Sequence, residues 1–396
     1  MFIHWLGLFM SLGVLLIIAR KSLPLAFVAS GVTLGIFTLS PIGIWVGIWE
    51  TATDPSVLLL AAAMGVIPMI GGVMEESGQM DRLVNNLRIG KRAFLVLSPG
   101  LVGMLPVPGG ALLSSPLVER VGAGIEGKTK AALNVWFRHV LFLIYPLGPA
   151  LIASAKIAGL KVYRVIPYLF PGFVVTLLIG WISFLRDVDD EDMAYSGALS
   201  IKGLLLPLSI LLLAPILDFL LQKVFVPSVP EWTTLIAVSS SLGLALLLSD
   251  LSWKDIRGIS EGMAPWSFSL MIIGMFIFFN IFKASGMSEL MASLAFSQPV
   301  VCLVTFLLGA VTGRVQLPTS VMIPTYLSMV GSNPMRPVVF AFIFFSAFLG
   351  YLVSPVHPCV SVSVEYFGVR IEDYLKAIAP PTLLALALTL MLALVL

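Results

Sequence analysis

Charged residues are scarce in this chain. Only 11% of its 396 residues are Asp, Glu, Lys or Arg, whereas soluble domains average about 25%. The net charge is +2 and no basic tract occurs, so a nucleic-acid partner is not expected. Runs of about 20 apolar residues recur along the whole length. The composition therefore excludes an ordinary soluble domain and predicts an all-α, multi-pass protein of the cell membrane, in contact with lipid.

Residues that build catalytic and metal centres are also few. The chain has three histidines (His4, His139 and His357) and two cysteines (Cys302 and Cys359). It contains no H-E-x-x-H motif, no disulfide framework and no phosphate-binding loop. Paired carboxylates suited to an aspartyl dyad are absent too. We therefore expect no enzyme and no zinc site, and no cofactor beyond a coupling ion such as Na⁺.

The most polar stretch, "RDVDDEDMAYSG" (186–197), lies near the midpoint of the sequence. It predicts a linker at 188–198 between a first half, 1–187, and a second half, 199–396. The apolar spans fall at about 2–19, 24–48, 55–75, 92–120, 132–155, 165–185, 199–222, 231–249, 264–283, 298–330, 337–356 and 374–395.

The two halves resemble each other. "AGLKVYRVIPYLFP" begins at 158 and aligns with "FGVRIEDYLKAIAP", which begins at 367, an offset of 209. "GMLPVPGG" at 103 aligns with "GRVQLPTS" at 313, an offset of 210. "YPLGP" at 145 aligns with "SPVHP" at 354, and "ESGQMDRL" at 76 with "ASGMSELM" at 284. The four pairs of segments occur in the same order in both halves and at nearly the same offset, which predicts an internal repeat.

Two long spans, 92–120 and 298–330, are interrupted near their middles by Pro, Gly, Thr and Ser. Each arm has too few residues to cross a hydrocarbon core of about 30 Å. We therefore expect two re-entrant hairpins, whose non-helical tips must be buried in protein or line a cavity. The alternative is a pair of full helices joined by a tight turn.

With the hairpins counted as no crossing, each half has five transmembrane helices, and this odd number inverts the second half relative to the first. Most Lys and Arg residues then lie on one side of the membrane, opposite the termini. The positive-inside rule places that side in the cytoplasm and both termini outside.

Inverted repeats with broken helices are typical of secondary transporters, which bind solute at mid-membrane where the broken elements meet. Arg314 suits a carboxylate or phosphate, and His357 could carry a proton or bond a solute. A snorkelling arginine and a neutral core histidine are the alternatives. The expected solute-binding residues are Pro108, Gly109, Gly110, Ser114, Ser115, Arg314, Pro318, Thr319, Ser320 and His357. The expected broken-helix or cation-binding residues are Pro146, Pro149, Pro355 and Pro358.

Other polar residues lie inside or near the ends of apolar spans. Arg138 and His139 follow Asn134 by about one turn, and could line the pathway, but an interfacial position is favoured. Asp218 lies about one turn from Lys223 near the end of a span and is also expected at the interface.

This order of helices, hairpin, broken helix and helix resembles the ion transporter superfamily, which includes divalent-anion:sodium symporters, citrate and gluconate permeases and arsenite pumps. It is most similar to an uncharacterised ten-helix family of archaeal and bacterial permeases. Relatives of the divalent-anion type carry Ser-Asn-Thr at both tips, and this chain does not. The resemblance implies a homodimer in which a transport domain moves as an elevator against a scaffold domain.

The sequence predicts a secondary active transporter of a small, anionic solute, coupled to Na⁺ or H⁺. The alternative is a Na⁺/H⁺ or other cation antiporter on the same scaffold. An antiporter would favour a buried carboxylate, and only Asp218 and Glu119 come close to that requirement.

Overall fold

The computed structural model describes residues 2–19, 21–105, 110–189, 199–331 and 333–395, and every regular element in these ranges is a helix. The first half contains α1 (Phe2–Ala19), α2 (Leu23–Thr38), α3 (Pro41–Thr53), α4 (Pro55–Glu76), α5 (Gln79–Asn85), α6 (Lys91–Gly103), α7 (Ala111–Val121), α8 (Gly127–Val140), the 3₁₀ turn η1 (Leu141–Leu143), α9 (Pro149–Ile157) and α10 (Val162–Phe184). The second half contains α11 (Ile201–Phe225), α12 (Glu231–Leu247), α13 (Trp253–Met263), α14 (Pro265–Ala284), α15 (Met287–Ala292), α16 (Gln298–Thr312), α17 (Gln316–Val330), α18 (Pro337–Val353), α19 (Pro358–Tyr366) and α20 (Ile371–Val395).

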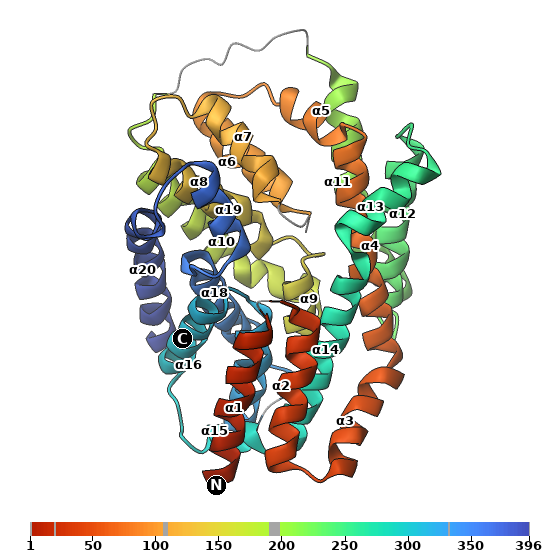
Figure 1. Ribbon diagram of the computed structural model, residues 1–396, viewed down its shortest axis with the longest axis vertical. Helices are drawn as coiled ribbons and strands as arrows, with labels where there is room; N and C mark the ends of the chain where they lie inside the picture. Colours follow the sequence, from red (N-terminus) through yellow and green to blue (C-terminus); the bar gives the residue numbers. More distant parts are fainter. Residues whose placement is uncertain (1, 20, 106–109, 190–198, 332, 396) are drawn as a thin grey trace.

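Helix ends recur between the halves at the predicted offset. Gly159 (φ 69°) and Gly368 (φ 61°) take the left-handed conformation after α9 and α19. In both turns the next amide donates to the carbonyl five residues earlier, from Leu160 to Ala155 and from Val369 to Val364. Figure 1 places α5 near the upper end of the molecule and α15 near the lower end. These observations favour the predicted repeat, while its inversion and its domain boundaries stay predictions.

One predicted span was wrong, and one helix was not predicted. Residues 24–48 do not form one span, because Pro41 cannot continue α2 and the Ser40 hydroxyl instead caps α3 by accepting from the Gly43 amide. The sequence analysis also missed α13, an amphipathic helix that starts at a capping box formed by Ser252 and Asp255.

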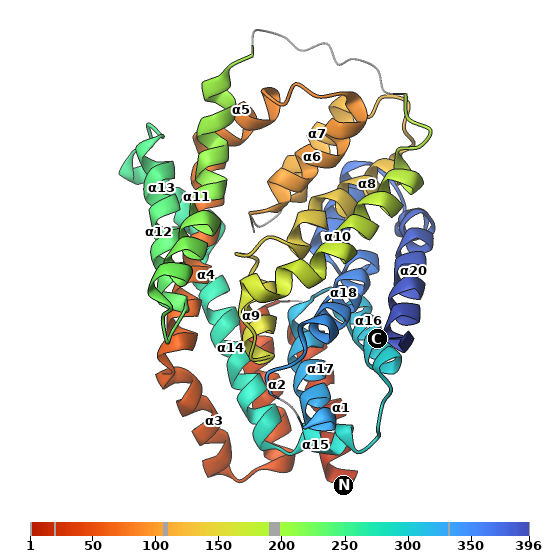
Figure 2. The same cartoon turned by 180° about the vertical axis from the view of Figure 1, so that it is seen from behind.

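The hairpins have the predicted form. Their arms α6, α7, α16 and α17 contain 13, 11, 15 and 15 residues. At 1.5 Å per residue each arm is about 16–22 Å long, too short for a hydrocarbon core of about 30 Å. Figures 1 and 2 show α6 and α7 in the upper half of the molecule and α16 and α17 in the lower half. Arms of this length favour the hairpins over a pair of full helices, and their return to the same side of the membrane stays a prediction.

Helix packing divides the chain into two groups. In the panel bundle, α2 packs on α1 and α14, and α4 packs on α12 and α14. In the hairpin bundle, α18 packs on α16 and α20, and α8 packs on α6, α7 and α10. The panel bundle thus comprises α1–α5 with α11–α14, and the hairpin bundle α6–α10 with α16–α20, while α15 packs mainly on α17 and also on α14. Contacts of α17 with α14 and α15 are the main connection between them.

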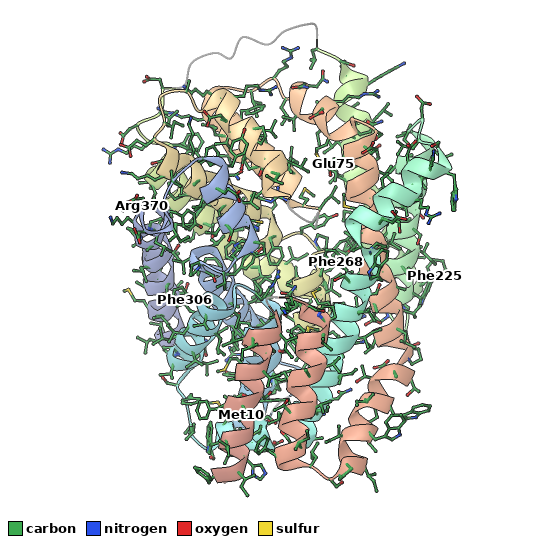
Figure 3. The ribbon with its side chains drawn as sticks, viewed as in Figure 1. Met10, Glu75, Phe225, Phe268, Phe306 and Arg370 are labelled. Atoms are coloured by element: carbon green, nitrogen blue, oxygen red, sulfur yellow. The ribbon has the colours of Figure 1, made fainter. Side chains whose placement is uncertain are left out.

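The outer surface is apolar. Seven described segments are long and apolar enough to cross a membrane: Phe2–Ala19, Pro55–Glu76, Val162–Phe184, Ile201–Phe225, Trp253–Ala284, Pro337–Tyr366 and Ile371–Val395. Side chains such as Phe225 (62% exposed) and Met10 (49% exposed) point outward in Figure 3. Such a surface is stable against lipid rather than water, so the chain is a multi-pass membrane protein.

A glycine in the first arm of each hairpin contacts the helix that follows the hairpin in the chain, and the two glycines occupy equivalent positions in the two halves. A Cβ on Gly100 of α6 would lie 3.3 Å from the Phe137 carbonyl of α8. A Cβ on Gly309 of α16 would lie 2.7 Å from the Ala347 carbonyl of α18. Small residues let membrane helices approach until their backbones touch. The hairpins therefore pack as closely as two helices can.

Replacing Gly309 with Ala should lower stability by about 1–3 kcal/mol, because the new methyl group would overlap a backbone carbonyl that cannot rotate away. Thermal unfolding of the purified protein in detergent measures this change. Gly243→Ala in α12 is the control, since no atom lies within 4 Å of its added Cβ. Equal unfolding temperatures for the two variants would contradict the close contact of α16 with α18.

Candidate functional site

Both helices that follow the hairpins are broken at the predicted prolines. Residues 144–148 separate η1 from α9, and residues 354–357 separate α18 from α19. Pro149 and Pro358 are the first residues of α9 and α19, where a missing amide proton costs nothing. Pro146 and Pro355 lie within the breaks themselves. The breaks leave backbone amides and carbonyls free inside the hairpin bundle.

The first hairpin tip is described only in part, because Pro108 and Gly109 lie outside the described residues. Gly110 is the N-cap of α7, and no side chain caps this helix. Ser114 and Ser115 are fully buried about one turn into α7, beyond the tip. The α7 N-terminus therefore presents its amide groups at the tip.

The second tip is displaced from its predicted position. It consists of residues 313–315, between α16 and α17, and includes Arg314. Pro318, Thr319 and Ser320 lie in the first turns of α17, because Pro is tolerated near a helix N-terminus. The Ser320 hydroxyl donates to the Leu317 carbonyl, a bond within its own helix. Gly313 (φ 60°) takes the left-handed conformation, and a Cβ there would lie 2.9 Å from the His357 amide nitrogen.

Hydrogen bonds cross between the two halves at the centre of the hairpin bundle. The Asn134 amide of α8 donates to the Ser115 hydroxyl of α7 and to the Ser363 hydroxyl of α19, both at 3.0 Å. The Ser154 hydroxyl of α9 donates to the Thr319 hydroxyl of α17 at 2.8 Å. All five side chains are buried. The Asn134–Ser363 and Ser154–Thr319 bonds cross between the halves, and α19 packs on α7 as α17 packs on α9.

Two guanidinium groups reach this centre. Arg138, in the last turn of α8, is 3% exposed, and its Nη1 donates to the Ser114 hydroxyl at 3.4 Å. Arg314 is half-buried at the second tip. Both lie near Tyr351 and His357. Within the described part of the chain, no carboxylate lies within ion-pair distance of either arginine.

An aromatic cluster lies beside the two arginines. His139 Nδ1 lies 2.7 Å from the Val135 carbonyl, and its Nε2 lies 3.1 Å from the Tyr351 hydroxyl. The His357 ring stacks on Tyr351 with a centroid distance of 3.8 Å. Sequence reasoning favoured the interface for Arg138 and His139, but both side chains are buried here.

A second polar group lies between the two bundles. Lys156 of α9 forms an ion pair with Glu231 of α12 at 2.8 Å and contacts the Ser56 hydroxyl of α4. Asp218 was expected at the interface, yet it is 3% exposed and accepts hydrogen bonds from four side chains. The donors are Tyr163, Gln222, Thr233 and Thr234.

Two cavities lie along the same boundary. An apolar cavity of about 400 Å³ adjoins the first helix break and α11, with Met104, Tyr145 and Phe219 in its lining. A more polar cavity of about 200 Å³ has Lys156, Asp218 and Glu231 in its lining. Pro146 lines both cavities. The bundles are therefore incompletely packed against each other along this boundary.

Sequence reasoning missed Ser154 and Ser363 of the centre, and also Tyr351 and Cys359 of the neighbouring aromatic cluster. One signal was present. Ser154 and Ser363 stand at the same offset of 209 as the broken helices around them, five residues after Pro149 and Pro358. No comparable pattern marks Tyr351 or Cys359.

The chain belongs to the family described as "Protein of unknown function (DUF401)", whose model matches residues 4–396. No curated protein matches the sequence. Among solved structures, the fold is similar to that of the YdaH transporter of Alcanivorax borkumensis, with a TM-score of 0.55 and 14% sequence identity. The similarity covers 94% of this chain and 96% of that one. The chain therefore shares the fold of that protein over nearly its whole length.

Replacing Asn134 with Leu should lower stability by about 1–3 kcal/mol, because two buried hydroxyls would lose their donor. Thermal unfolding in detergent again reports the change. Thr33→Val is the matched control, since that hydroxyl bonds only the Ala29 carbonyl of its own helix. If both variants unfolded at the same temperature, the crossed contacts would have no part in holding the halves together.

Proposed function

We propose that this protein is a secondary active transporter of a small anionic solute, an organic carboxylate or a similar oxyanion, coupled to Na⁺ or H⁺. The solute site lies at the centre of the hairpin bundle, between the two tips and the two helix breaks. The transporter fold and the apolar outer surface support the class of protein.

One observation carries the choice of an anion. Arg138 and Arg314 bring two positive charges to the centre, and no carboxylate of the described chain pairs with them. An uncompensated charge inside a membrane protein is costly and marks a functional position. A guanidinium can donate two parallel hydrogen bonds to a carboxylate, which makes it a specific partner for such a solute.

Helix N-termini add to this positive potential. α7, α9, α17 and α19 all begin at the tips or the breaks, and no side chain caps any of them. Uncapped N-termini offer free amides and partial positive charge to an anion. Four of them in one region, with two arginines, make an anionic solute the best fit.

The coupling ion needs oxygen ligands rather than amides. Asn134 Oδ1 is buried and has no hydrogen-bond partner among the described residues, and the same holds for Ser354 Oγ in the second break. Oxygen atoms of this kind, with carbonyls freed by the breaks, are typical ligands of Na⁺ in transporters. We assign the coupling ion to this side of the centre.

The division into two bundles supports elevator-type movement. The hairpin bundle would be the transport domain and the panel bundle the scaffold, through which a homodimer would form as the resemblance implies. Few helix contacts cross the boundary, and two cavities lie along it. The Lys156–Glu231 ion pair would separate when the hairpin bundle moves.

The cation-antiporter alternative has less support. It needs a carboxylate at the centre that can bind and release a cation. Asp218 is buried but lies in α11 of the panel bundle, where four side-chain donors already occupy it. Glu119 is exposed and pairs with Lys130. Neither residue faces the two arginines.

Replacing Arg138 or Arg314 with Gln should weaken binding of the transported anion at least about tenfold. An ion pair at about 4 Å is worth about 4 kcal/mol at an effective dielectric constant of 20, so even partial loss is measurable. A screen of small carboxylates and oxyanions by thermal stabilisation, with and without Na⁺, would identify the anion, and calorimetry would measure its affinity.

Arg257→Gln is the matched control, because Arg257 is exposed on α13 and pairs with Glu261. If no anion stabilised the protein while Na⁺ or protons alone did, the antiporter would replace this proposal. Unchanged affinity in both central variants would remove the arginines from the site.

Cross-linking the two bundles should stop transport without abolishing anion binding. Lys156→Cys with Glu231→Cys, in a background of Cys302→Ser and Cys359→Ser, places one thiol on each side of the boundary. A bifunctional maleimide would join them, and transport would be followed in liposomes. An Arg257→Cys and Glu261→Cys pair is the control, because both residues are exposed and adjacent on α13 of the panel bundle. Continued transport by the cross-linked protein would exclude elevator movement at this boundary.

A further inference from the structure

Most of the histidine and cysteine of this chain lies in one place. The chain has three histidines and two cysteines, and His139, His357 and Cys359 gather with their ligand atoms within 4.8 Å of one another. His139 belongs to α8 of the first half, whereas His357 and Cys359 belong to the second helix break and the start of α19. An apolar membrane interior gives no reason for these three side chains to meet.

Hydrogen bonding prepares His139 to coordinate a metal. A carbonyl can only accept, so the short contact of Nδ1 with the Val135 carbonyl requires the proton on Nδ1. Nε2 then carries a lone pair and faces the cluster, where it accepts from the Tyr351 hydroxyl. Metal-binding histidines usually have this arrangement, with the second nitrogen donating to a carbonyl or carboxylate.

His357 supplies an independent observation. Its side chain is 1% exposed, and neither ring nitrogen forms a hydrogen bond of good geometry with the described residues, the Tyr351 backbone being the nearby polar group. Leaving a buried polar group unpaired costs about 1–3 kcal/mol, so a partner for this ring is expected. Cys359 is partly exposed, which gives an ion access to the cluster.

We propose that His139, His357 and Cys359 form a binding site for a soft, monovalent d-block ion, Cu⁺. Two imidazoles and a thiolate are soft to borderline ligands, which select Cu⁺ or Zn²⁺ over hard ions such as Mg²⁺. The choice between these two follows from charge. A Zn²⁺ ion with one thiolate would add one positive charge beside Arg138 and Arg314, whereas Cu⁺ with the same thiolate adds none.

The geometry requires a small adjustment. Bonds of about 2.0–2.3 Å in a trigonal site place the ligand atoms about 3.5–3.8 Å apart, so the widest separation here must shrink by about 1 Å. Coordination breaks the S–H bond of Cys359, forms the sulfur–metal bond and releases one proton to solvent. The Tyr351 hydroxyl, which occupies His139 Nε2, must turn away.

Competition with the Cu⁺ chelator bicinchoninate, under anaerobic conditions with ascorbate, tests the site on the full-length protein in detergent. The expected result is one Cu⁺ per chain, with one proton released. Affinity should fall at least about tenfold in Cys359→Ser, His357→Gln and His139→Gln. It should be unchanged in Cys302→Ser and His4→Gln, which alter the remaining cysteine and histidine. Tyr351→Phe should bind as well or better, since it removes the competing hydroxyl.

Several outcomes would overturn the proposal. The first is that Cys359→Ser binds Cu⁺ as tightly as the unaltered protein does. The second is that no stoichiometric Cu⁺ binding occurs, and the third is that Zn²⁺ binds as tightly as Cu⁺ through the same residues. Unfolding temperatures without metal show whether a variant fails only because it misfolds, and Cys359→Ser is close enough in size to fold normally.

The site is separable from the proposed transport function. Arg314→Gln should lose anion affinity and keep Cu⁺, while Cys359→Ser should lose Cu⁺ and keep the anion. If the arginine variants left anion affinity intact, the transport proposal would fail without affecting the metal site.

Discussion

The arrangement of the hairpin bundle depends on a small set of buried hydrogen bonds that cross between the halves. Asn134 links α8 to both α7 and α19, and Ser154 links α9 to α17. Lipid provides no hydrophobic force between helices, so packing and hydrogen bonds must supply the specificity of association. Because the Asn134–Ser363 and Ser154–Thr319 bonds join opposite halves, the position of each helix break depends on the other half.

Two features bring charge and free backbone groups to the same place. The prolines of each Pro-x-x-Pro sequence end a helix and begin another, so new N-termini appear in the interior. Glycines at 100 and 309 bring each hairpin against the broken helix beside it. The result is a polar centre surrounded by an apolar exterior, with Arg138 and Arg314 as its only unpaired charges among the described residues.

Much of this arrangement follows from sequence alone. The proline pairs, the short hairpin arms and the repeat offset each have a local physical cause, and the structure has breaks and hairpins where they predict them. The meeting of His139 with Tyr351 could not be predicted, because 212 residues separate them and the contact depends on how α8 lies against α18. α13 was not predicted because its amphipathic sequence lacks a long apolar run. The second hairpin tip lies before Pro318 rather than at it, because a proline can occupy the first turn of a helix as well as the loop that precedes it.

The crossed contacts also constrain how the protein is made. Asn134 leaves the ribosome 229 residues before its partner Ser363. Until α19 has been synthesised, the Asn134 side-chain amide has only one of its two hydrogen-bond acceptors, Ser115. The Ser154 hydroxyl likewise lacks its acceptor Thr319, which is synthesised 165 residues later. The first half is thus synthesised before its hydrogen-bond partners exist, and the polar centre cannot be complete until α19 has been made.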